Sequence, residues 1–83
     1  MTNGIMELDV HGMNTEEAVQ AAMKAVQQAG SSVYRIRIIH GYHGGTRIRS
    51  RIREEFSYGR EPRVKRMEMG SNQGITELVL REY

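Results

Sequence analysis

Residues 5–41, IMELDVHGMNTEEAVQAAMKAVQQAGSSVYRIRIIHG, predict a strand, a helix and a second strand in that order. The first strand is expected over residues 5–10, whose apolar start and polar exit are typical of a central parallel strand. The helix begins at a capping box formed by Asn14 and Glu17, after which apolar residues recur at helical spacing. A β-branched strand over residues 33–40 follows. Because parallel strands joined by a helix form a right-handed crossover, we expect the two strands in one sheet.

A second helix is predicted after the glycine-rich loop at residues 41–45, which ends the second strand. Ile48, Ile52 and Phe56 lie four residues apart, so this helix begins near Thr46 and places its arginines on the remaining faces. Two shorter apolar stretches then predict a third and a fourth strand, separated by a turn at residues 70–74; they are residues 64–69 and 75–81.

The order βαβαββ assigns the chain to the α/β class, as an α+β two-layer sandwich of two helices on a mixed four-stranded sheet. At 83 residues we expect a single free-standing domain over residues 1–83. The sequence contains no cysteine, which excludes disulfides and thiolate zinc sites. It also contains no secretion signal and no apolar run that could cross a bilayer. We therefore expect a cytoplasmic protein with no membrane contact, and the sequence indicates no oligomeric state.

The positive charge is concentrated in one segment of the chain. Residues 47–66 hold eight cations against three acidic residues, a net charge of +5, whereas the whole chain carries +2. Seven of these cations are arginines, whose planar fork suits bidentate phosphate contacts. Arg49 and Arg53 of the second helix are therefore candidates for nucleic-acid binding, although a solvated helix face is an equally simple interpretation.

Polar side chains gather where the first two strands end. Asp9 and His11 stand two residues apart at the end of the first strand, and His40 closes the second. The carboxyl ends of parallel strands meet at one edge of a sheet, where ligand sites form. The loop that follows, with Gly41, His43, Gly44, Gly45 and Thr46, leads into a helix N-terminus, which favours an anion such as phosphate. Each feature alone has an ordinary structural explanation, and their expected convergence is what favours function.

These residues resemble the signatures of a known family. Residues 8–12, LDVHG, are similar to the Leu-Asp-Leu-His-Gly signature of Smr domains, the small MutS-related modules. Residues 40–46, HGYHGGT, resemble a variant of their second signature, His-Gly-x-Gly-x-Gly. GIT at residues 74–76 with LVL at residues 78–80 is similar to the closing strand of the family, so the resemblance covers nearly the whole chain.

The resemblance implies a fold like the C-terminal domain of a bacterial translation initiation factor, with the last strand antiparallel to the others. It also implies nicking or endoribonuclease activity on DNA or RNA, and for some members mRNA cleavage at stalled ribosomes. By the same match Asp9, His11, His40 and Gly41 carry over as site residues. His43 departs from the family pattern, because it replaces the usual middle glycine of the second signature, and its side chain either narrows the loop or adds a donor.

With RNA as the substrate, the 2′-hydroxyl is a built-in nucleophile and no cofactor is required. One histidine takes the hydroxyl proton and a second protonates the leaving 5′-oxygen, while Asp9 orients one imidazole. Gly44, Gly45 and an arginine stabilise the charge that develops at phosphorus. Arg37, on the strand that leads to His40, is a further candidate for this role, with a surface ion pair as its alternative.

DNA lacks this nucleophile, so water must attack and a divalent metal is usually needed. Only Asp9 is an obvious oxygen ligand, which favours RNA over DNA. Two other function classes stay open. The chain is a non-catalytic nucleic-acid or ribosome binding module that uses the basic helix and stacks bases on Tyr42 or Tyr58, or it is an enzyme acting on a small phosphorylated metabolite.

Overall fold

The computed structural model describes residues 4–41, 46–57 and 59–81. Its elements follow the predicted order, as β1 (Ile5–Asp9), α1 (Thr15–Gln28), β2 (Arg35–Ile39), α2 (Arg47–Phe56), β3 (Arg66–Met69) and β4 (Ile75–Val79). The predicted strand bounds differ from the observed ones by at most two residues at either end. The capping box of α1 is confirmed, because the Asn14 side chain accepts from the Glu17 N–H at 2.8 Å and the Glu17 carboxylate accepts from the Asn14 N–H at 3.2 Å.

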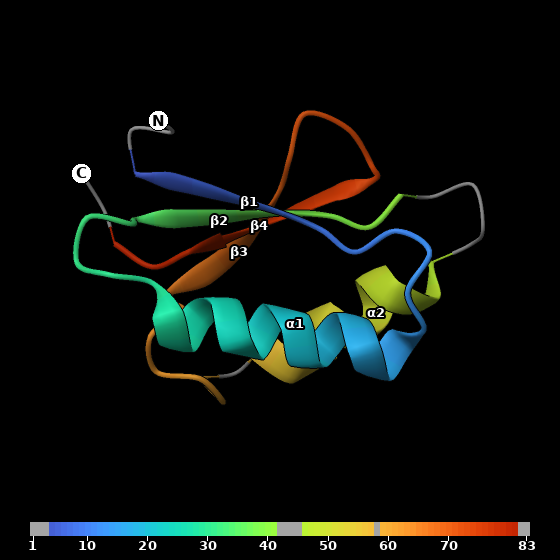
Figure 1. The fold of residues 1–83 in the computed structure, drawn as a ribbon, viewed down its shortest axis with the longest axis horizontal. Coiled ribbons are helices and arrows are strands. Elements are labelled where there is room, and N and C mark those ends of the chain that lie inside the picture. The colour runs from blue at the N-terminus through green and yellow to red at the C-terminus, as the bar shows by residue number, and fades with distance from the viewer. Residues whose placement is uncertain (1–3, 42–45, 58, 82–83) are drawn as a thin grey trace.

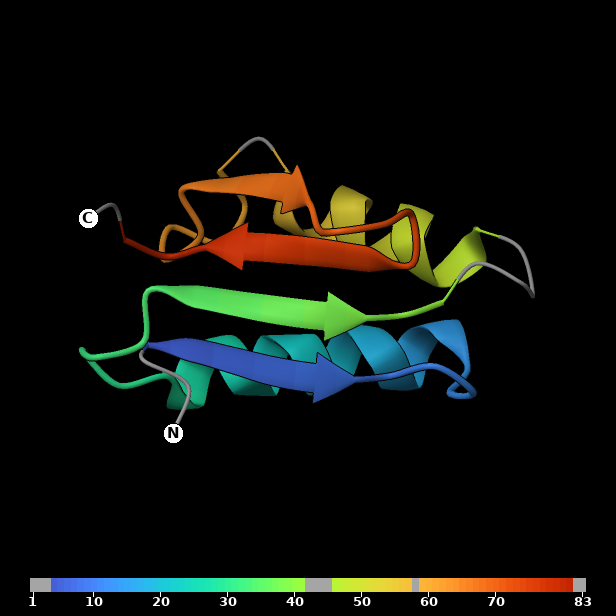
Figure 2. The same ribbon diagram turned by 90° about the horizontal axis from the view of Figure 1, so that it is seen from above.

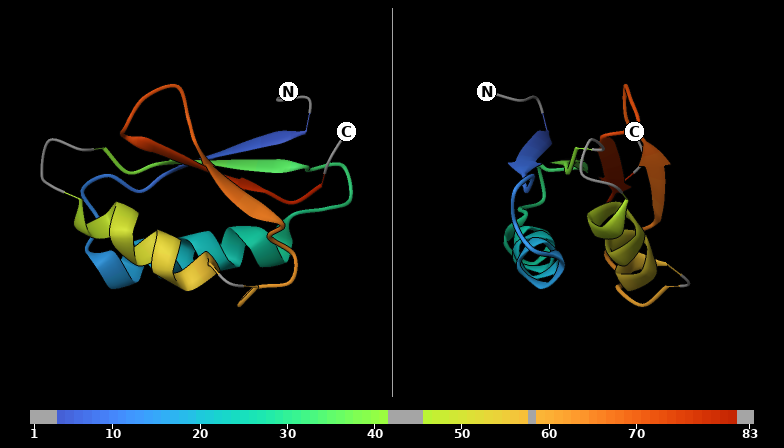
Figure 3. Two further views of the ribbon diagram at one scale, coloured as in Figure 1. Left: turned by 180° about the vertical axis from the view of Figure 1, so that it is seen from behind. Right: turned by 90° about the vertical axis from the view of Figure 1, so that its right-hand side faces the viewer.

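The molecule has two layers, with both helices on one face of a four-stranded sheet (Figure 1; Figure 3). The strand order is β1-β2-β4-β3, and β1 is parallel to β2. β4 is antiparallel to both β2 and β3, so it runs opposite to the other three strands, as Figure 2 shows. The predicted two-layer α+β sandwich with an antiparallel last strand is therefore confirmed.

The prediction that β1 is a central strand is wrong. Among the described strands β1 pairs only with β2, which places it at an edge of the sheet, and Glu7 and Asp9 on it are exposed. β2 and β4 are the interior strands, and four of the five residues of β4 are buried. The apolar start of β1 marks one buried face of an edge strand, because strand order depends on pairing between distant segments rather than on local hydropathy.

The core fills the space between the sheet and the two helices. Ile36, Ile38 and Leu78 on the sheet are fully buried. They belong to one cluster with apolar residues of both helices, including Val19, Ala22 and Val26 of α1 and Ile52 and Phe56 of α2. Each large side chain buried in this way contributes roughly 1.5–3 kcal/mol. This packing fixes both helices against the sheet and with them the loops at the carboxyl ends of β1 and β2.

Candidate nucleic-acid site

The ends of β1 and β2 meet at one edge of the sheet, beside the start of α2 (Figure 1). The Val10 N–H donates to the Ile39 carbonyl at 2.9 Å, which continues the pairing past both strands. A Cβ atom built on Gly41 would lie 3.7 Å from the Cβ of His11. The structure thus brings the chain at Asp9, His11, His40 and Gly41 together, as the sequence predicts.

Asp9 and His11 form an exposed carboxylate–imidazole pair. One carboxylate oxygen of Asp9 accepts from the His11 backbone N–H at 3.1 Å and also contacts Nδ1 of the ring. The imidazole lowers the pKa of Asp9, and the backbone N–H of His11 lowers it further. Because the ionised carboxylate holds the proton on Nδ1, the tautomer leaves Nε2 able to accept a proton. The side chains are 52% and 69% exposed for Asp9 and His11, so a substrate can reach this nitrogen.

His40, in contrast, is buried and bonded through both ring nitrogens. Nδ1 donates to the Gly41 carbonyl at 2.8 Å, and Nε2 lies 2.8 Å from the Thr76 hydroxyl, which donates to it in this tautomer. Burial lowers the pKa of His40, and the positive charges of Arg49 and Arg53 lower it further. The ring is therefore neutral near pH 7 and fixed in place. The sequence predicts His40 as a catalytic group, and the structure shows both of its ring nitrogens bonded within the protein.

The start of the loop is held by the turn before β4. The backbone N–H groups of His40 and Gly41 both donate to the Gly74 carbonyl, at 2.9 and 3.0 Å. Gly41 has a φ of +75°, a left-handed conformation that side chains rarely adopt. Reasoning from periodicity and motif chemistry did not single out Gly74 and Thr76 as supports of the site. Their signal was the GIT stretch, which resembled the closing strand of the family.

The predicted phosphate cradle is described only in part. His43, Gly44 and Gly45 lie outside the described residues, as do Tyr42 and Tyr58. Thr46 is exposed and stands at the N-cap of α2, where its carbonyl accepts from the Ser50 N–H at 2.8 Å. The first turn of α2 contains no acidic residue, so its positive dipole end is not neutralised from within the helix.

The arginines of α2 divide into two groups. Arg51 is bonded to Glu55 at 2.9 Å and to Glu16 of α1 at 3.3 Å, so its charge is used between the helices. Arg49 and Arg53 form no ion pair with any residue in the described part of the chain, and their charges are close enough to His40 to affect its pKa. Arg47, the first residue of α2, likewise forms no ion pair within the described part of the chain, so three of the four arginines of this helix keep an unpaired charge there.

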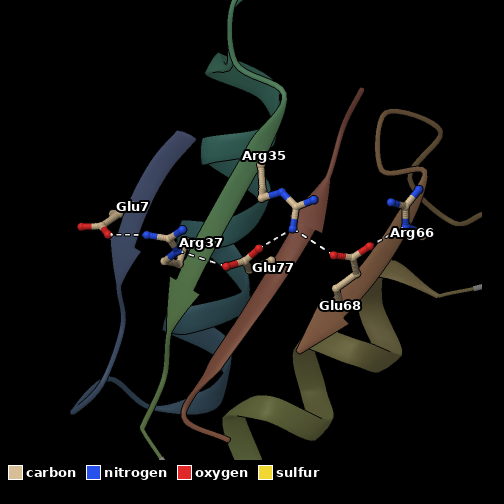
Figure 4. Close-up of polar contacts among 6 residues, drawn as sticks. All are labelled: Glu7, Arg35, Arg37, Arg66, Glu68 and Glu77. Carbon is tan, nitrogen blue, oxygen red and sulfur yellow. Dashed lines mark hydrogen bonds and ion pairs between the residues drawn. The ribbon is translucent and has the colours of Figure 1, made fainter. Parts of the chain in front are cut away.

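Arg37 lies elsewhere, on the face of the sheet that the helices leave open. It donates to Glu7 at 3.1 Å and to Glu77 at 3.1 Å. Glu77 also pairs with Arg35, and the ion pairs continue across the sheet through Glu68 to Arg66 (Figure 4). This row has three arginines and three glutamates, so its charges balance. The surface ion pair given as the alternative for Arg37 is what the structure shows.

No group of three or more histidine, cysteine, aspartate or glutamate side chains within the described residues is arranged to hold a metal ion. Neither helix in the described part of the chain is long and apolar enough to span a membrane.

Comparison with known proteins gives a consistent result. The family model for the Smr domain matches residues 8–77, which is most of the chain. The crystal structure of the Smr domain of Thermus thermophilus MutS2 superimposes with a TM-score of 0.79 and 27% sequence identity. The match covers 93% of this chain and 99% of that one. No curated protein sequence matches the chain.

Proposed function

Since the chain belongs to the Smr domain family, a family of nucleic-acid-binding and nuclease-like domains, we propose that it binds RNA and cleaves its phosphodiester backbone. The observation that carries this proposal is the exposed Asp9–His11 pair at the edge of the sheet. The protein is then an endoribonuclease that acts in the cytoplasm.

The Asp9–His11 pair has the geometry of a general base. The Asp9 carboxylate holds Nδ1 of His11 protonated, so Nε2 takes the proton of a ribose 2′-hydroxyl. The 2′-oxygen attacks the adjacent phosphorus, the bond to the 5′-oxygen breaks, and the products are a 2′,3′-cyclic phosphate and a 5′-hydroxyl. A positioned base of this kind contributes about 10²–10⁴-fold to the rate.

The leaving 5′-oxygen must receive a proton. His40 supplies it only by giving up its bond to Thr76, because both ring nitrogens are occupied. We therefore assign His40 to holding Gly41 in place, and propose that solvent or His43 provides the proton. Arg49 and Arg53, which have no ion-pair partner among the described residues, bind the phosphates, together with the N-H groups of the 41–45 loop and Thr46.

RNA is preferred over DNA on chemical grounds. The 2′-hydroxyl supplies the nucleophile, so the reaction on RNA requires no cofactor, whereas DNA cleavage calls for an activated water and usually a divalent metal. Asp9 with His11 would offer one carboxylate and one imidazole to such a metal.

The alternative is a binding module without catalysis, acting on RNA alone or on the ribosome. The observation that favours it is the pair Arg49 and Arg53 on a helix of positive charge near the site.

Two variants separate the two functions. His11→Ala should abolish cleavage of a single-stranded RNA and leave its Kd unchanged, because the imidazole acts on the proton rather than on the phosphates. Arg49→Gln with Arg53→Gln should raise the Kd and reduce the slope of log K against log salt by about 1.4, since each phosphate contact to a single strand contributes about 0.7. If wild type binds RNA without cutting it, or His11→Ala cuts as fast as wild type, the nuclease proposal fails and the binding module stands.

A further inference from the structure

A second cationic site lies at the opposite end of the molecule. A hollow of about 220 Å³ is bounded by the end of α1, the turn before β2, the segment between α2 and β3, and the residues after β4. In Figure 1 these segments gather at the left-hand end, away from the edge that holds Asp9 and His11. We call this hollow the distal pocket. Its lining includes three apolar residues and three cations, which are Val33, Pro62, Leu80, Arg63, Lys65 and Arg81.

Three cations line the distal pocket, and none of the acidic residues within ranges 4–41, 46–57 and 59–81 lines it. Arg63, Lys65 and Arg81 are exposed, and none of them forms an ion pair with a residue in ranges 4–41, 46–57 and 59–81. Glu61, in the neighbouring turn, uses its carboxylate to accept from the backbone N–H of Arg63 at 2.9 Å. Glu61 keeps its negative charge, and the dipole at the carboxyl end of α1, which faces this region, adds about half a negative charge; three full positive charges outweigh the two together. The pocket therefore keeps a net attraction for an anion.

The backbone around the distal pocket is well held. The Lys65 N–H donates to the Val79 carbonyl at 2.8 Å, and the Leu80 N–H donates to the Tyr34 carbonyl at 2.8 Å. The Val33 N–H closes a turn onto Gly30 at 3.0 Å. The cations thus project from ordered segments, which reduces the entropy lost when they bind a ligand.

The composition of the pocket indicates the kind of ligand. Apolar surface from Val33, Pro62 and Leu80 lies beside the three cations. Pockets for whole small molecules measure about 300–1,000 Å³, so 220 Å³ suits a phosphate and part of its nucleotide rather than an entire cofactor. Proteins that bind single-stranded nucleic acids also combine cations with apolar surface, because the cations attract the phosphates and the apolar surface contacts the bases.

The distal pocket lies too far from Asp9 and His11 to touch the same nucleotide. The strand between the two ends, from Tyr34 to Gly41, spans about 23 Å at 3.3 Å per residue. Basic residues occur along the way, because α2 leads from the His11 edge toward this end, and exposed Arg53 and Arg60 precede Arg63. A single strand cleaved at one end can follow this side of the molecule to the other.

We propose that the distal pocket is a second phosphate-binding site, which holds a nucleotide of the same RNA strand several positions away from the cleaved bond. This inference rests on the proposed function for the identity of the ligand. It makes the substrate an extended single strand rather than a dinucleotide, and it makes affinity depend on strand length.

The test measures binding without cleavage. Single-stranded RNAs that carry 2′-O-methyl groups lack the nucleophile, so their anisotropy reports binding alone. One is a dinucleotide and the other has about 16 nucleotides, the upper end of the site sizes of small single-strand-binding domains. Wild type is compared with Arg63→Gln and Arg81→Gln over a series of salt concentrations. Lys24→Gln, an exposed residue of α1 outside the distal pocket, is the control with the same change of charge.

We expect each of the two arginine variants to lower the salt slope for the long RNA by about 0.7, the value for one lost phosphate contact, and to leave the dinucleotide unaffected. Arg63→Lys should restore the slope, because it restores the charge. Amide NMR signals of Val33, Arg63 and Arg81 in the wild-type protein should shift with the long RNA only. The proposal is overturned if both arginine variants bind the long RNA like Lys24→Gln, or if these signals do not move.

The outcome is separable from that of the proposed nuclease function. If unmodified RNA is not cleaved but the arginine variants show the length-dependent loss, the nuclease proposal fails and the distal pocket stands. If RNA is cleaved and the arginine variants match the control, the distal pocket alone is refuted.

Discussion

Removing the Thr76 hydroxyl tests the link between the central strand and the site. Thr76→Val keeps the side-chain volume but leaves Nε2 of His40 without its donor at 2.8 Å. Thr76 is 1% exposed and His40 is 6% exposed, so water does not easily replace the lost bond. An unsatisfied buried acceptor costs about 1–3 kcal/mol. For a domain of this size 1 kcal/mol corresponds to about 4–8 °C, so a loss of 2 kcal/mol lowers the Tm by roughly 8–16 °C.

The assay is urea unfolding of a double-mutant cycle made of Thr76→Val, His40→Leu and their combination. Replacing both partners by apolar groups removes the unsatisfied acceptor, so the double variant should lose less stability than the sum of the single variants, by about 1 kcal/mol or more. If Thr76→Val costs under about 0.5 kcal/mol, the level of a surface substitution, or if the two changes are additive, the reasoning about this bond is wrong.

Three further predictions concern charge. Glu77→Gln should lower the free energy of unfolding by about 2 kcal/mol, which is less than the 3–5 kcal/mol of a fully buried pair because the arginine partners of Glu77 are 23% and 33% exposed. Glu7→Gln should lower it by under about 1 kcal/mol, and equal losses of the two variants in urea unfolding would contradict this. Burial lowers the pKa of His40, so the unfolded chain binds more protons than the folded one, and the free energy of unfolding should decrease as the pH falls below 6.5 toward the lower folded pKa. Urea unfolding at a series of pH values should show this decrease for wild type and not for His40→Leu. Asp9→Asn should slow RNA cleavage by about 10²-fold at an unchanged Kd, because the amide no longer holds Nδ1 of His11 protonated; a rate equal to wild type would show that the pair is not catalytic.

Local patterns in the sequence account for much of the fold. Asn14 and Glu17 mark the start of α1 because a capping box is a contact between near neighbours, and it is present. The spacing of Ile48, Ile52 and Phe56 likewise predicts which face of α2 packs on the sheet, and Ile52 and Phe56 are buried. In both cases the period of the backbone decides which residues meet.

Strand order and charge pairing are different, since both join residues far apart in the chain. β1 lies at the edge because β4 and β3 are both added on the side of β2 away from β1, which no local pattern reveals. From the sequence of its strand alone, Arg37 is a candidate for phosphate binding. Only the register of β2 with β4 places Glu77 opposite it. A glutamate on a central strand is the signal that could have indicated a paired arginine.

The sequence predicts where the candidate site lies, but it does not predict the protonation state and bonding of the residues in it. Asp9 and His11 lie two residues apart, so their contact is local and the motif predicts it. The neutral state of His40 follows from its burial, and its Nε2 is bonded to Thr76, which is 36 positions further along the chain. The distal pocket is built from four separate segments, and therefore has no motif of its own.

The most direct test of the central claim compares one RNA sequence with the same sequence carrying a single 2′-deoxyribose at the cleaved position, both in EDTA. Wild type should cut the RNA, leave a 2′,3′-cyclic phosphate, and fail at the deoxy position, while His11→Ala cuts neither. If the deoxy substrate is cut as fast as the RNA, or if His11→Ala retains the wild-type rate, cleavage does not proceed through the 2′-hydroxyl and His11.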